Sequence, residues 1–155
     1  DLQSDQLFSK ITNFLITGSS TVVIEDLAAY SLRLTPQVID TAKWIGMAEM
    51  RLKMASTANV ELIPRSLVKK WVFDTFDTAK SMCRAKVKKA VDKGKYAHRE
   101  ASFVYVDDKI VTECIKEYWN IPKPPPGSGY QFGLKEHSWQ ALAVATFHIQ
   151  KSPQE

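Results

Sequence analysis

The sequence predicts an α/β fold in which parallel strands alternate with helices. Two short apolar runs, Thr21 to Asp26 and Val60 to Ile63, have the length and the β-branched content of strands. Segments with helical spacing stand before, between and after these runs, so the first half reads helix, strand, helix, strand, helix. Because parallel strands need a crossover connection, this alternation favours a parallel sheet with helices packed on it.

The first predicted strand ends on a carboxylate. Thr21-Val-Val-Ile is a continuous apolar run, typical of a strand buried on both faces, and Glu25 follows it directly. Folds of this class place their chemistry at the ends of strands, so Glu25 is a candidate metal ligand or catalytic carboxylate. The other interpretation is a strand-end acid that simply meets water, and the residues alone leave both open.

Two helices are predicted from capping signals in the first third of the chain. Thr35-Pro36 combines a capping hydroxyl with proline in the first turn, and the helix is expected to run to about Met54. Gly46 in its middle costs ~1 kcal/mol relative to alanine, which indicates close packing there. Ser4 is expected to cap an earlier helix, whose apolar face is Leu7, Phe8, Ile11 and Leu15.

Further helices are predicted downstream. Ser66 begins one whose buried face carries Val68, Val72 and Phe76. Asp107 or Asp108 begins the next, and a Pro/Gly-rich loop follows at residues 122–129. The last helix is expected to start near Lys135.

Residues 79–105 form a predicted basic insertion. Its positive side chains cluster around Gly94, and they are Lys80, Arg84, Lys86, Lys88, Lys89, Lys93, Lys95 and Arg99. One interpretation is a solvated helix face followed by a loop, which is what charge runs usually are. The other is an arm that contacts phosphates, adding salt-sensitive affinity for nucleic acid without reading its sequence. Both interpretations stay open at this point.

Composition bounds the class of protein. The 155 residues predict one domain over residues 1–150 with a frayed tail at 151–155, and 45% of them are hydrophobic. A net charge of +4 is a mild basic bias, compatible with an anionic partner. Cys83 and Cys114 lack a metal-site spacing and indicate reduced thiols, so we expect a cytoplasmic protein. No run has the length of a membrane span, so no membrane partner is expected.

Several short motifs occur in a suggestive order. They are Val-Ile-Glu25, the long helix with Gly46, Leu-Val-Lys69, Asp108-Lys109 opening a helix that ends in Asn120-Ile-Pro122, and His137-x-x-Gln140-Ala-Leu-Ala. In this order the chain, from its first helix to about residue 150, resembles the RuvC family of Holliday junction resolvases, and its phage-type members in particular. The resemblance implies an RNase H-like mixed sheet flanked by helices on both faces.

The same resemblance implies a function. It is that of a crossover junction endodeoxyribonuclease, which hydrolyses phosphodiesters of branched DNA such as four-way junctions with Mg²⁺, or alternatively Mn²⁺. It makes Glu25, His137 and Gln140 the metal ligands and Glu25, Lys69 and His137 the catalytic residues. Lys69 and Lys109 would then stand beside the phosphate. The setting implied is a bacterial or phage-infected cell.

Two departures from the family pattern keep an alternative open. The family begins with an Asp-bearing strand, whereas this sequence opens with the helix that should follow it, so either that strand precedes Asp1 or the chain is a degenerate or split member. In addition, Gln140 stands where the family has an acidic ligand. The alternative is a catalytically impaired RNase H-like module that binds branched or single-stranded nucleic acid without cleavage. A junction nuclease is expected to act as a homodimer, because two symmetric nicks need two sites related by a two-fold axis. The helix around Gly46, Met47 and Met50 is the candidate interface.

Overall fold

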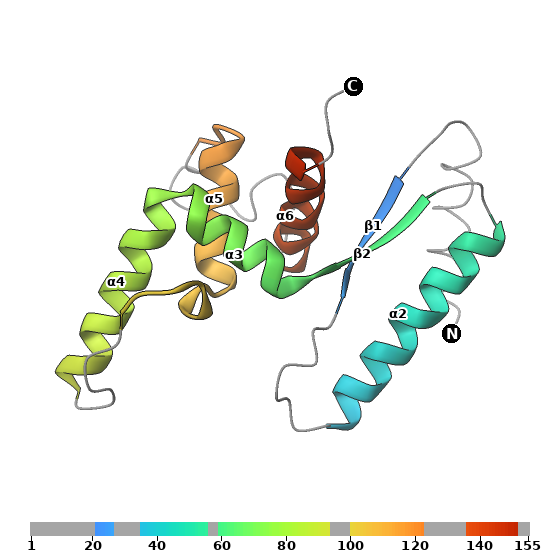
Figure 1. The fold of residues 1–155 in the computed structure, drawn as a ribbon, viewed down its shortest axis with the longest axis horizontal. Coiled ribbons are helices and arrows are strands. Elements are labelled where there is room, and N and C mark those ends of the chain that lie inside the picture. The colour runs from blue at the N-terminus through green and yellow to red at the C-terminus, as the bar shows by residue number, and fades with distance from the viewer. Residues whose placement is uncertain (1–20, 27–34, 56–58, 94–99, 123–135, 152–155) are drawn as a thin grey trace. The chain divides into compact units, whose positions relative to one another are not determined.

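The structure is a computed structural model, and it describes five stretches of the chain: residues 21–26, 35–55, 59–93, 100–122 and 136–151 (Figure 1). The chain divides into two compact units, Asp1–Arg65 and Ser66–Glu155. The helix predicted after Ser4 lies outside the described residues, as do 123–129 of the predicted loop and 152–155 of the predicted tail.

The sheet of unit 1 consists, in the described residues, of two parallel strands. Strand β1 (Thr21–Asp26) pairs with β2 (Asn59–Pro64) so that Val22 faces Val60 and Glu25 faces Ile63. Helix α2 (Pro36–Ala55) connects them and runs alongside both (Figure 1). The two predicted strands and their parallel direction are confirmed.

Helix α2 begins where its capping signal predicts. The Thr35 hydroxyl accepts a hydrogen bond from the Val38 N–H at 3.4 Å, and the Thr35 carbonyl accepts one from the Ile39 N–H at 3.1 Å. Ala48 and Leu52 are buried on its inner side. They pack against three half-buried strand residues, Val22, Ile24 and Val60.

The close packing predicted at Gly46 is wrong in the described part of the chain. Gly46 is exposed on α2, and a Cβ built there would meet no atom within 4 Å.

The predicted RNase H-like mixed sheet is wrong. Helices hold 76% of the described residues, and the described sheet has only two strands. The reason is visible after Pro64, where buried apolar residues recur every three or four positions, a helical spacing: Val68, Val72, Phe76, Ala79, Cys83 and Val87. The residues from Val22 to Glu25 are half-buried, so the expected burial of β1 on both faces is also wrong.

Unit 2 is helical. It contains α3 (Arg65–Thr75, which begins at the last residue of unit 1), α4 (Asp77–Asp92), a 3₁₀ turn η1 (Phe103–Tyr105), α5 (Asp108–Tyr118) and α6 (Glu136–Lys151). Helix α5 packs against both α4 and α6. The fully buried core comprises Val72, Ala79, Cys83, Ile110, Cys114, Ile115 and Ala143. Trp71 adds edge-to-face contacts with Phe76, Tyr118 and Phe147, at ring-centroid distances of 5.5 to 6.4 Å.

One carboxylate links the beginning of α5 to α4. Asp107 is the N-cap of α5, and its Oδ1 accepts a hydrogen bond from the Ile110 N–H at 3.0 Å. Its other oxygen, Oδ2, binds the ammonium of Lys86 on α4. Lys86 also donates to the Tyr105 carbonyl at 3.2 Å. Asp107 therefore stabilises α5 locally and connects two elements that are 21 residues apart.

Helix α5 also ends on a defined motif. Asn120 has a φ of 50°, in the left-handed region that asparagine tolerates better than most residues. The Ile121 N–H donates to the Lys116 carbonyl at 2.8 Å, and the Asn120 N–H donates to the Glu117 carbonyl at 3.1 Å. This is the Schellman arrangement, and it explains why the helix stops before Pro122.

The Asp107 contacts predict a pH-dependent contribution to stability. Partial burial raises the pKa of Asp107, but the hydrogen bonds from Lys86 and Ile110 and the charge of Lys86 outweigh it, so the pKa lies below its ordinary value of 3.8. A lowered folded-state pKa means that this stabilisation is present above pH 3.8 and is lost as pH falls through the folded-state pKa. Asp107→Ala should therefore lower the free energy of unfolding by about 1 kcal/mol at neutral pH, as measured by denaturant titration.

Asp107→Asn is the matched control, because it keeps an acceptor for the Ile110 N–H but loses the charge facing Lys86. At neutral pH, Asp107→Asn should lower the free energy of unfolding by less than Asp107→Ala does. Both losses should shrink as the titration is repeated below pH 3.8. An Asp107→Ala deficit that stays the same in acid would contradict this assignment.

The two cysteines supply a probe of the α4–α5 contact. Both side chains are fully buried, and burial raises the pKa of Cys83 and raises that of Cys114 to about 12. Because only the thiolate is nucleophilic, neither should react with an aromatic disulfide reagent at neutral pH while the helices stay packed. Absorbance should report no fast thiol in the native protein and two in denaturant. Rapid reaction of either native thiol would show that this contact is not closed.

Candidate nucleic-acid interface

The apolar stripe of α4 decides which of its residues face water. Ala79, Cys83 and Val87 recur every fourth residue and are buried. The rest of the helix is rich in alanine, lysine and arginine, which have high helix propensity. With the stripe packed inside unit 2, the opposite side of the helix is left in solvent.

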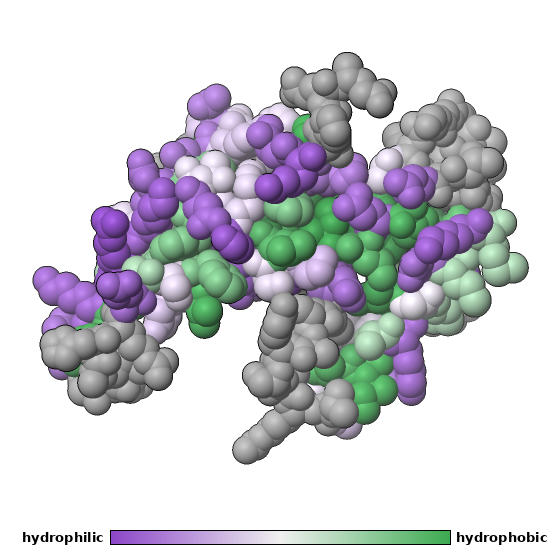
Figure 2. Space-filling model, in the orientation of Figure 1, coloured by the Kyte–Doolittle hydropathy of each residue, from purple (hydrophilic) through white to green (hydrophobic). Residues whose placement is uncertain are grey.

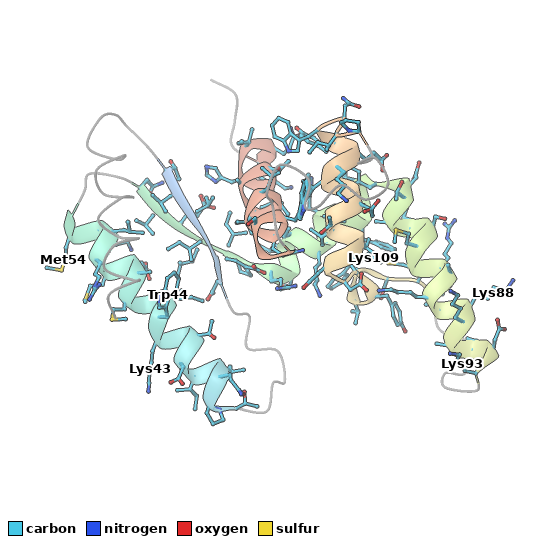
Figure 3. The ribbon with its side chains drawn as sticks, turned by 180° about the vertical axis from the view of Figure 1, so that it is seen from behind. Lys43, Trp44, Met54, Lys88, Lys93 and Lys109 are labelled. Carbon is cyan, nitrogen blue, oxygen red and sulfur yellow. The ribbon has the colours of Figure 1, made fainter. Side chains whose placement is uncertain are left out.

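That opposite side carries four exposed cations, which we call the α4 basic face: Arg84, Lys88, Lys89 and Lys93. Hydrophilic side chains gather over α4 in Figure 2, and Figure 3 shows Lys88 and Lys93 near its carboxyl end. Among the described residues, no ion pair or hydrogen bond of these four side chains is found. Asp92 is an exposed acid on the same side, four residues after Lys88, but no ion pair joins it to the four cations in the described part of the chain, so the face carries a net positive charge.

The spacing of these cations does not favour the helix itself. Arg84 and Lys88 are four residues apart, as are Lys89 and the C-cap Lys93, and each such like-charge pair destabilises a helix by about 0.2–0.5 kcal/mol. At the carboxyl end the helix dipole favours Lys89 by about 0.3–1 kcal/mol, so the net cost lies with Arg84 and Lys88. The surrounding unit does not neutralise them either. Residues 66–155 hold 15 basic and 10 acidic residues, a net charge of +5, whereas residues 1–65 hold 6 and 7, a net charge of −1. A polyanion on this face would remove the repulsion.

Two other lysines of α4 have partners inside unit 2. Lys86, predicted as a nucleic-acid contact, is half-buried and bound to Asp107 and the Tyr105 carbonyl. Lys80 pairs with Asp77 at 3.2 Å. These contacts separate Lys86 from the α4 basic face and give it a structural role that the sequence did not predict.

The remaining predicted phosphate contacts differ in position. Lys109 is exposed in the first turn of α5, two residues after the Asp107 that Lys86 binds, and it is labelled in Figure 3. A cation there is disfavoured by the helix dipole, so it too adds little to the helix. Lys69 is half-buried on α3 and already has an interaction within the chain. Lys95 and Arg99 lie outside the described residues.

The predicted carboxylate Glu25 lies in unit 1. It stands on β1 opposite Ile63, with a side chain that is 28% exposed. Its Oε1 forms an ion pair with the Arg65 guanidinium at 3.2 Å. The acid at the strand end therefore has a cation beside it, which compensates its charge without a metal.

Of the two predicted ligands on α6, Gln140 is described in full. It is 8% exposed, and its amide nitrogen donates a hydrogen bond to the Asp108 carbonyl on α5 at 3.2 Å. This contact connects α6 to the start of α5. For His137 the structure describes the helical backbone, and its side chain lies outside the described residues. Its convergence with Glu25 stays a prediction.

Metal binding by these residues can be judged from their surroundings. Within the described ranges, no cluster of three or more His, Cys, Asp or Glu side chains is placed to hold an ion. Glu25 faces a guanidinium, and Gln140 is neutral and bonded to backbone. In the described part of the chain these residues do not fit a two-metal centre, and binding of Mg²⁺ or Mn²⁺ stays a prediction.

Sequence reasoning missed the partner that the structure gives to Glu25. Arg84, whose spacing of four from Lys88 places both on one side of a helix, was predicted as part of the basic cluster. Arg65 was not predicted as the partner of Glu25. No local signal joins residues 40 positions apart, so this pairing could be found only in the folded chain.

Comparisons with known proteins add no relative. No protein-family model, no curated protein and no solved structure matches the chain. Within the described ranges, none of the helices combines the length and the apolar content needed to span a bilayer. The function is therefore argued from the charged surface itself.

Proposed function

We propose that this chain is a nucleic-acid-binding module that holds the phosphate backbone through the α4 basic face without cleaving it. The observation that carries the proposal is the set of four exposed cations on one side of α4, with no partner among the described residues. Their unit is the positively charged part of the chain. Binding without cleavage is the second function that the sequence left open, and the RNase H-like fold expected with it is not the observed one.

The face has the dimensions and chemistry for backbone contacts. From Arg84 to Lys93 the helix advances about 13 Å, a length over which a DNA strand with one phosphate per roughly 3.4 Å carries about four phosphates, and the four side chains spread over about 180° of the helix surface. Arg84 can contact a phosphate with two parallel N–H groups, whereas the lysines act as point charges. Such contacts hold a nucleic acid in place but do not read its sequence.

Two contacts support binding over cleavage. The Glu25 carboxylate is paired with Arg65, and the Gln140 amide is bonded within the helical unit. Hard carboxylate ligands are what Mg²⁺ chemistry requires, and the expected RNase H-like sheet that would gather them is not the observed fold. The nuclease predicted from the resemblance therefore becomes one of the outcomes to be tested.

Neutralising the face should weaken binding and its salt dependence together. Arg84→Gln combined with Lys88→Gln and Lys89→Gln removes three phosphate contacts, so the slope of log affinity against log salt should become shallower by about 2.7 on duplex DNA and by about 2.1 on a single strand. Fluorescence anisotropy with a labelled four-way junction, a duplex and a single strand would measure both quantities. All three ligands should lose affinity, because the contacts are to backbone.

The matched control is Lys53→Gln combined with Lys70→Gln and Lys151→Gln. It removes the same three charges from exposed positions on α2, α3 and α6. The control should leave the salt slope unchanged. Equal losses in the two triple variants would mean that net charge alone drives binding, and an unchanged affinity after the α4 substitutions would contradict the proposed face.

Cleavage is tested separately. The wild-type chain is incubated with a labelled four-way junction and Mg²⁺ or Mn²⁺, and the strands are examined on a denaturing gel. We expect retained binding and intact strands, with Glu25→Gln leaving affinity unchanged because Glu25 is not part of the α4 basic face. Nicking that disappears in Glu25→Gln would support the junction nuclease and contradict a purely binding role.

A further inference from the structure

The four cations of the α4 basic face form two rows. Arg84 and Lys88 stand about 40° apart around the helix, as do Lys89 and Lys93, because each residue adds about 100° of rotation. The centres of the two rows are about 140° apart. Figure 3 labels one lysine of each row, Lys88 and Lys93. The exposed side of α4 therefore has positive charge along both of its flanks.

Short side chains occupy the arc between the two rows. The exposed residues there, which we call the α4 central arc, are Ser81, Ala85 and Asp92. They lie within about 40° of one another, and their centre is about 180° from that of the buried stripe. All three side chains are shorter than those of lysine and arginine. The helix backbone can therefore come close to another surface along this arc, while the long cations extend past it on both flanks.

The separation of the rows selects the form of nucleic acid that meets both. A DNA duplex is stiff over about 150 base pairs, so it does not wrap round a helix. A duplex lying alongside α4 would contact one row and leave the other turned away. The major groove differs, because a strand of phosphates runs along each of its two sides. In B-form DNA this groove is about 12 Å wide, and an α-helix with its side chains is about 10–12 Å across.

We propose that α4 enters the major groove of duplex DNA. Arg84 and Lys88 contact phosphates of one strand, Lys89 and Lys93 contact phosphates of the other, and the α4 central arc faces the base edges. This inference rests on the proposed function and deepens it, because it names the form of nucleic acid and the groove. The buried stripe stays packed inside unit 2, on the side of α4 that points out of the groove.

The α4 central arc has groups that match those on the base edges of this groove. The Ala85 methyl can contact the methyl group of thymine, and the Ser81 hydroxyl can bond to donors and acceptors alike. The Asp92 carboxylate can accept a hydrogen bond from the amino group of cytosine. The phosphate contacts position the helix, and the arc adds a preference among bases to an affinity that charge supplies.

The first experiment locates the groove by chemical protection. The full chain is added at saturation to a labelled DNA duplex, which is then treated with dimethyl sulfate. This reagent methylates guanine N7 in the major groove and adenine N3 in the minor groove, so one gel reports both grooves. We expect protection of guanine N7 and unchanged methylation of adenine N3. Binding without guanine N7 protection would overturn the proposal and leave the proposed function standing, whereas absence of any binding would reject both.

The second experiment asks whether both rows are used at once. Arg84→Gln combined with Lys88→Gln removes one row, and Lys89→Gln combined with Lys93→Gln removes the other. Each pair should make the slope of log affinity against log salt shallower by about 1.8 on duplex DNA. A pair that leaves this slope unchanged would show that the duplex lies against one flank only, and would overturn the proposal.

The third experiment fills the α4 central arc without changing charge. Ala85→Trp puts a bulky ring where the helix approaches the groove floor and should raise the dissociation constant for duplex DNA at least about tenfold, a loss of about 1.4 kcal/mol. Single-stranded DNA should keep its affinity, because its bases can stack on the ring. The matched control is Ala141→Trp, at an exposed position on α6, which should change neither affinity. Circular dichroism checks that each variant is folded.

Duplex RNA of the same base sequence supplies a test that needs no substitution. The major groove of an A-form helix is deep and too narrow for side chains to read, so α4 should not enter it. We expect duplex RNA to bind the wild-type chain more weakly than duplex DNA at the same salt concentration. Equal affinity for the two duplexes, or an Ala85→Trp variant that binds duplex DNA as the wild type does, would overturn the proposal.

Discussion

Burial of one side of α4 is the constraint on which the rest of unit 2 depends. Ala79, Cys83 and Val87 form a stripe that is buried where α4 packs in its unit. A helix with one apolar stripe has one favourable rotation against its neighbours, because any other rotation exposes that stripe to water. The cations on the remaining arc are then turned to solvent. Their common orientation follows from apolar packing and needs no charged partner to set it.

The lysines of α4 serve two different purposes as a result of this rotation. Lys86 lies at the margin of the stripe, where it reaches Asp107 and the Tyr105 carbonyl. The same Asp107 caps α5, so one ion pair contributes to the position of two elements. Lys88 and Lys89 lie further round the helix and remain exposed. Helical rotations of about 60° and 160° thus separate the structural cation Lys86 from Lys89 and Lys88, which we propose for the nucleic acid.

In unit 1, helix α2 carries more apolar residues than the strands β1 and β2 cover. Helix α2 packs Ala48 and Leu52 on the strand residues, while Met50 and Met54 stay exposed on its other side.

Elements that depend on neighbouring residues could be predicted, and those that depend on distant ones could not. The strand ending at Glu25, the start of α2 at Thr35 and the cap at Asp107 all follow from local chemistry, and the structure has each of them. The RNase H-like sheet was wrong because the order of elements along the chain does not determine which segments pair, and in the described residues only Thr21–Asp26 and Asn59–Pro64 do. The basic cluster was recognised from composition, but which of its members were exposed was not.

The sequence by itself determined local periodicity, capping and the excess of positive charge after residue 65, since these are properties of adjacent residues and of composition. Only the tertiary structure decided the partner of each charge. Glu25 meets Arg65 across 40 residues, and Lys86 meets Asp107 across 21. The physical reason is that ion pairs form between side chains that packing brings together. The number of residues that separate two side chains in the sequence does not predict whether packing does so.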